Sequence, residues 1–225
     1  MMLSRKLLAA FALAGLAVAT ARAETVTIGA VSLTIEPPAG YCALGATEAE
    51  RVLVAELQQT LRPRNELLQV CAPCSQVKEL NAGTISRFSR WAIVQVVGTG
   101  PDLKPMAGTR AQLISSMAPA VSSGNLNVEA VNASIREKLS RKDCQLTAQK
   151  MAVVGSDEKA AYVTMSASFA LPNGTPPVPM EMFGAVTLVK QHPLGIFACE
   201  KQDAPQGVLP TVVARDYLAS VLSKN

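Results

Sequence analysis

The segment from Lys150 to Glu200 constrains the fold more than any other part of this 225-residue chain. It contains successive strand-like runs, and the connectors between them are short and rich in turn-forming residues. The predicted strands are Lys150–Val154, Ala160–Phe169, Met180–Lys190 and Ile196–Glu200. Strands joined by short connections pair antiparallel, because a parallel pair needs a crossover of about a dozen residues. We therefore predict an antiparallel meander.

Helical patterns flank this meander on both sides. The first expected helix begins at a T-x-x-E capping box formed by Thr47 and Glu50. Its apolar stripe has helical spacing and consists of Leu53, Leu57 and Leu61 with Val54. Further helices are predicted over residues 109–121, from Asn127 and from Pro210. Together these patterns predict a single α+β domain over residues 24–225, in which helices cover an antiparallel sheet with the 150–200 meander at its centre.

Residues 1–23 have the pattern of a secretory signal peptide. Two basic residues precede an apolar run, Leu7–Ala19, and Ala21-Arg22-Ala23 forms an A-x-A cleavage site. The run is shorter than the roughly 20 residues that span a bilayer. We therefore expect a mature chain that begins at Glu24 and is periplasmic or secreted, with no membrane span after cleavage.

The charge balance argues against nucleic acid as a partner. The full chain has 21 Lys and Arg against 17 Asp and Glu, but three of the basic residues belong to the expected signal peptide. The mature chain is left with a net charge close to zero and without a basic stripe interleaved with aromatic residues. We therefore expect an unknown protein or small-molecule partner, and no nucleic acid.

The mature chain has an odd number of cysteines: Cys42, Cys71, Cys74, Cys144 and Cys199. In an oxidising compartment disulfides are the default interpretation, and an odd count leaves at least one thiol unpaired. We predict that Cys42, at the end of a proline-glycine corner, pairs with Cys74, and that Cys144 pairs with Cys199. Cys71 follows an apolar run and is then the unpaired cysteine.

The Cys71-Ala72-Pro73-Cys74 motif supports an alternative, in which Cys71 and Cys74 are catalytic. The motif lies between a predicted strand and a predicted helix, where the helix N-terminus would lower the pKa of the first thiol. It resembles the C-x-P-C motif of thioredoxin-like oxidoreductases. Against this stands the predicted hairpin over residues 151–169, because that family has a helix at the corresponding position.

No cofactor or metal site is expected from the sequence. A structural zinc site needs four ligands, and His192 is the only histidine. It lies in a Gln-His-Pro-Leu-Gly turn, where we expect a solvated residue.

The mature chain resembles uncharacterised small secreted proteins of Gram-negative bacteria. The resemblance rests on the Pro37–Cys42 corner, on Cys74 before the Gln76–Leu80 helix, and on the closing Leu222-x-x-Asn225. In architecture the chain also looks like the MOG1/PsbP-like α/β/α sandwich. The resemblance implies an adaptor or assembly factor. The predicted function is therefore an exported binding or assembly module without intrinsic catalysis, and the alternative is a periplasmic thiol-disulfide oxidoreductase.

Overall fold

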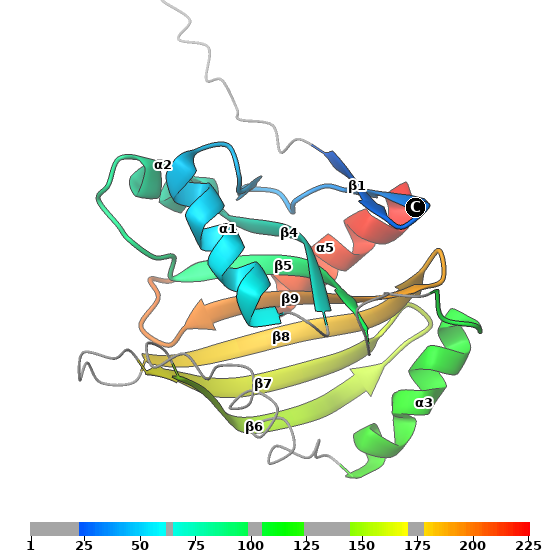
Figure 1. Cartoon of the computed structure of the whole chain (residues 1–225). Coiled ribbons are helices and arrows are strands. Elements are labelled where there is room, and N and C mark those ends of the chain that lie inside the picture. Colours follow the sequence, from blue (N-terminus) through cyan, green and yellow to red (C-terminus); the bar gives the residue numbers. More distant parts are fainter. Residues whose placement is uncertain (1–22, 62–64, 99–104, 124–144, 171–177) are drawn as a thin grey trace, which may run out of the picture.

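The computed structural model describes residues 23–61, 65–98, 105–123, 145–170 and 178–225. Within these ranges the chain forms a seven-stranded antiparallel sheet, a separate two-stranded ribbon and four helices (Figure 1). The predicted α+β class with an antiparallel sheet is confirmed. The expected signal peptide up to residue 22 and the helix predicted from Asn127 lie outside the described residues.

The strand order of the large sheet is β3-β4-β5-β9-β8-β7-β6. The second half of the chain supplies β6 (Gln145–Ser156), β7 (Ala161–Ala170), β8 (Val178–Val189) and β9 (His192–Lys201). The first half supplies β3 (Tyr41–Ala43), β4 (Asn65–Pro73) and β5 (Arg90–Val97). Because β9 pairs with β5, the predicted meander forms one half of the sheet and runs out to its edge at β6.

The two faces of the sheet are covered by different elements (Figure 1). One face carries α5 (Pro210–Lys224) and the ribbon of β1 (Glu24–Ile28) and β2 (Val31–Ile35). The other carries α1 (Glu48–Leu61) and α3 (Arg110–Ser123), and α2 (Cys74–Asn81) lies beside α1. β1 and β2 pair antiparallel, from Glu24 opposite Ile35 to Ile28 opposite Val31.

Each face has its own apolar core. On the α5 face the fully buried side chains include Leu33, Ile35, Val94, Ile196, Tyr217 and Val221. On the α1 face, Leu57 and Leu61 of α1 and Met117 of α3 pack against a buried cluster that contains Val70 and Phe197. The apolar stripe of the first helix therefore faces the core, as its spacing predicts.

Two glycines let Phe197 lie flat on the α1 face. Gly184 is the cross-strand partner of Phe197, and Gly195 precedes it by two residues on the same strand. A Cβ atom at Gly184 would lie 2.1 Å from Phe197 Cδ1, and one at Gly195 would lie 2.4 Å from its Cε2. Any side chain at either position would displace the ring.

Arg90 fixes the loop that leads into α5. Its Nε donates to Glu200 Oε1 at 2.8 Å, and its guanidinium also donates to the carbonyl oxygen of Pro205. The side chains of Arg90 and Glu200 are only 11% and 20% exposed, so this ion pair is largely shielded from solvent. Arg90 at the start of β5 thereby joins the end of β9 to the loop before α5.

Candidate functional site

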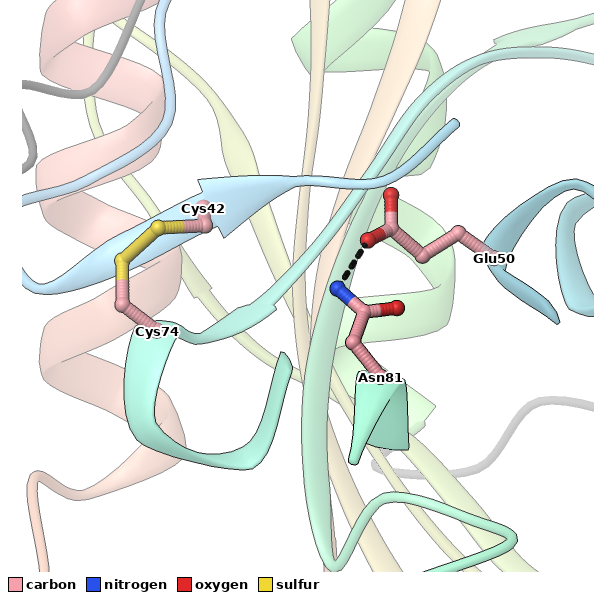
Figure 2. The surroundings of a disulfide bond; sticks show 4 residues. All are labelled: Cys42, Glu50, Cys74 and Asn81. Atoms are coloured by element: carbon pink, nitrogen blue, oxygen red, sulfur yellow. Dashed lines mark hydrogen bonds between the residues drawn. A yellow bond between two sulfur atoms is a disulfide. The ribbon is translucent and has the colours of Figure 1, made fainter. Parts of the chain in front are cut away.

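The disulfide joins Cys42 of β3 to Cys74 at the start of α2, with a Cα–Cα distance of 5.0 Å (Figure 2). Cys42 is opposite Ala72 in the β3–β4 register, and the Cys74 N–H donates to the carbonyl of Gly40 at 2.9 Å. The proline-glycine corner therefore brings the two cysteines together. This is the pair that the sequence led us to expect.

Cys71 is not a partner of Cys74 in this structure. The strand continues through Pro73, and the Cys71 side chain is fully buried on the α5 face beside Tyr217. Burial raises the pKa of the Cys71 thiol to about 12. A thiol with such a pKa remains protonated at neutral pH, whereas a redox-active cysteine must be a thiolate.

The predicted pairing of Cys144 with Cys199 involves a residue, Cys144, that lies outside the described residues, so it stays a prediction. Cys199 lies in β9 with a free, buried thiol.

A buried carboxylate ties α1 to α2 next to the disulfide. Glu50 is 1% exposed, and its Oε2 accepts the N–H groups of Gly45 and Ala46, both at 2.8 Å. Its Oε1 accepts from Asn81 Nδ2 at 2.8 Å (Figure 2). Burial raises the pKa of Glu50, but the hydrogen bonds from Asn81 and the backbone outweigh it and hold the pKa below its ordinary value. The Glu50 carboxylate therefore has a structural role, because both of its oxygens accept hydrogen bonds from the protein.

The capping box at the start of α1 is present. Thr47 Oγ1 accepts the Glu50 N–H at 3.3 Å and donates to Asn81 Oδ1 at 2.7 Å.

Thr47→Ala should therefore lower the free energy of unfolding by about 0.5–2 kcal/mol, because it removes the acceptor of an N-terminal amide. Urea denaturation measures the change, and Thr47→Ser, which keeps the hydroxyl, is the control. Equal midpoints for the wild type and the alanine variant would contradict the role of this cap.

His192 is buried, which corrects the expectation of a solvated turn residue. The turn between β8 and β9 consists of Lys190 and Gln191 alone, both with positive φ, so His192 already pairs with Val189 as the first residue of β9. Its side chain lies on the α5 face and is 2% exposed. Neither ring nitrogen has a hydrogen-bond partner among the described residues, and burial lowers its pKa.

His192 should make the fold sensitive to mild acid. Because its pKa is lower in the folded than in the unfolded chain, its contribution to stability is complete above about pH 6.5 and is lost as the pH falls below that value. The loss is at most about 1.4 kcal/mol per pH unit. Urea unfolding at pH 7.5 and 5.5 measures it in the wild type and in His192→Gln. The free energy of unfolding of the variant should depend less on pH than that of the wild type. An identical pH dependence in both proteins would refute the assignment of the acid sensitivity to His192.

A cavity of about 280 Å³ lies between α1 and the outer edge of β4. Its apolar lining consists of Leu44, Val54, Ala55, Leu67, Leu68 and Val70. Gln58 and Gln69 add amide groups, and Glu24 and Arg51 add charges of opposite sign. Both charges already have partners, because Arg51 Nη2 pairs with Glu48 Oε2 at 2.8 Å and Gln69 Nε2 donates to Glu24 Oε2 at 3.0 Å.

This cavity was not predicted from the sequence. One signal could have pointed to it: only a few residues separate Tyr41 from the helix cap at Thr47, so a strand starting at Tyr41 must be short. The strand that pairs with it, β4, has nine residues. Because β4 is longer than β3, part of the outer edge of β4 has no partner from β3.

Within the described part of the chain, no cluster of three or more His, Cys, Asp or Glu residues is arranged to hold a metal ion. In the same ranges, no helix combines the length and the apolar character needed to cross a membrane. Comparisons of the chain with protein-family models and with curated proteins found no match.

Proposed function

We propose that this protein is an exported binding or assembly module without intrinsic catalysis. The observation that supports the proposal best is the cavity between α1 and β4. Its apolar side chains provide contact area, its amides provide hydrogen-bonding groups, and its two charged residues, Arg51 and Glu24, are held by neighbours. Such a lining suits binding better than acid–base chemistry, which needs a titratable group free to exchange a proton with the substrate.

Export is supported by the Cys42–Cys74 disulfide, because structural disulfides persist in oxidising compartments. Cleavage after Ala23 would leave the whole β1–β2 ribbon in the mature chain, since β1 begins at Glu24. The resemblance to MOG1/PsbP-like sandwiches favours the same adaptor or assembly role.

Photo-crosslinking from the cavity tests the binding role in exporting cells. A benzoylphenylalanine in place of Arg51, which lines the cavity and is exposed, should form a discrete adduct. The matched control is the same substitution at Ala49, which is exposed on α1 but outside the lining. Absence of any adduct that is specific to position 51 would count against the cavity as the binding site.

The purified mature protein should also fail to accelerate the reduction of insulin by dithiothreitol. A redox C-x-x-C motif needs an accessible thiolate, and here Cys71 is buried and Cys74 is bonded to Cys42. A thioredoxin is the positive control. Turnover above background that disappears in Cys71→Ser would establish the oxidoreductase function instead.

A further inference from the structure

We propose that the cavity binds a short, uncharged, extended peptide segment of a partner protein, which adds a strand to the outer edge of β4. This inference rests on the proposed binding function and names its partner class. Strand addition is a common mode of peptide recognition, in which backbone hydrogen bonds supply affinity and side-chain pockets supply specificity.

The first step of the argument is the uncovered edge of β4. β3 pairs with β4 only from Cys71 to Pro73, and the contact ends where the Leu44 N–H donates to the Val70 carbonyl at 2.9 Å. Beyond this point no described strand lies on the outer side of β4 from Leu67 to Gln69. The cavity lies along this same stretch.

The second step is that a side chain takes the place of the missing strand. The Leu67 N–H donates to Gln58 Oε1 at 2.8 Å, so a side-chain amide of α1 occupies a position at which a neighbouring strand would present a carbonyl. The Nε2 of the same amide is buried and has no hydrogen-bond partner among the described residues. A backbone carbonyl of an entering strand can accept the Leu67 N–H in place of Gln58 Oε1. The Gln58 amide is then released, and its Nε2 can find a hydrogen-bond partner.

The third step concerns what the segment carries. The apolar lining suits an inserted apolar side chain, and the volume of about 280 Å³ lies at the lower end of the range of about 300–1,000 Å³ that small-molecule sites span. The lining has one negative and one positive side chain, Glu24 and Arg51, so its net charge is zero and a charged residue in the segment is not required. A β-bulge between Leu67 and Gln69 interrupts the regular edge, which restricts pairing to a short segment.

The experiment uses the mature full chain and four blocked, fluorescein-labelled heptapeptides of alternating Ser, Thr and Val. Their central residue is Leu, Ile, Phe or Met. Fluorescence anisotropy measures their affinities, and the amide NMR signal of Leu67 reports where they bind. A second set has the same sequences with N-methylated backbone amides on alternate residues. Because N-methylation removes the backbone donors, it should weaken binding about tenfold or more.

Three variants complete the design. Ala55→Trp should block the cavity and weaken binding about tenfold or more, while the matched surface variant Ala49→Trp should leave the affinity unchanged. Gln58→Ala removes the competitor for the Leu67 N–H and should tighten binding about 2- to 10-fold. Circular dichroism and thermal melts establish that each variant is folded.

Each outcome separates strand addition from the wider binding function. If methylated and unmethylated peptides bind equally and both are blocked by Ala55→Trp, the cavity is a binding site but strand addition is refuted. If no peptide binds at about 1 mM while the benzoylphenylalanine at position 51 still crosslinks in cells, the peptide class is refuted and the binding function stands. Failure of both experiments would refute the two proposals together.

Discussion

Replacing Cys74 with serine should lower the free energy of unfolding by about 3–4 kcal/mol, because it opens the Cys42–Cys74 disulfide. The bond spans 32 residues and therefore restricts a long stretch of the unfolded chain, which raises the free energy of the unfolded state. The folded state should change little, since Cys74 is the first residue of α2 and serine is compatible with a helix start. Guanidinium denaturation of the oxidised proteins measures the difference.

Reductant provides the control for this prediction. Dithiothreitol should bring the wild type down to the stability of Cys42→Ser/Cys74→Ser and should leave that double variant unchanged. The double variant also removes the Cys42 thiol, which could otherwise form a different disulfide in the single variant. An unchanged midpoint in Cys74→Ser, or a peptide map that shows a Cys71–Cys74 bond, would contradict the observed connectivity.

Truncating Leu218 to alanine should destabilise the protein by about 2–5 kcal/mol, the range for a fully buried leucine. Leu218 is 2% exposed and lies in the core on the α5 face, where α5 packs against β8, β9 and β2. Closely packed neighbours on three elements leave little freedom for the cavity to collapse, so the lost contacts are not replaced. The loss is measured as the shift of the urea midpoint at constant slope.

Leu209→Ala is the matched control for this truncation. Leu209 is the same residue type at the start of the same helix, but it is 63% exposed. Its truncation should change stability by no more than about 0.5 kcal/mol. Similar effects at the two positions would show that α5 does not dock on the sheet through Leu218.

Local patterns in the sequence were sufficient for much of the fold. Alternation and turn residues predicted β6 to β9, because the two-residue period of a strand and the short connections are properties of neighbouring residues. The same is true of the T-x-x-E box at Thr47, whose two partners are one helical turn apart. The position of the meander within the sheet was not predictable in this way, since it depends on the pairing of β9 with β5.

The cysteines show where local reasoning stops. Cys42 and Cys74 could be paired in advance, because the proline-glycine corner and the strand before Cys74 suggested neighbouring positions. Cys199 offered no such link to a partner, and its thiol is free and buried in β9. Spacing along the chain carries no information about which strands become neighbours in the sheet.

The sequence by itself determined the α+β class, the meander and the start of the first helix. Only the tertiary structure decided which surfaces are buried and which are open: the burial of His192 depends on a two-residue turn and on the core of the α5 face. The cavity beside β4 exists because β3 ends after three residues while β4 continues, and because α1 places Gln58 at the Leu67 amide. Both features arise from contacts between segments distant in sequence, which no periodicity of neighbouring residues encodes.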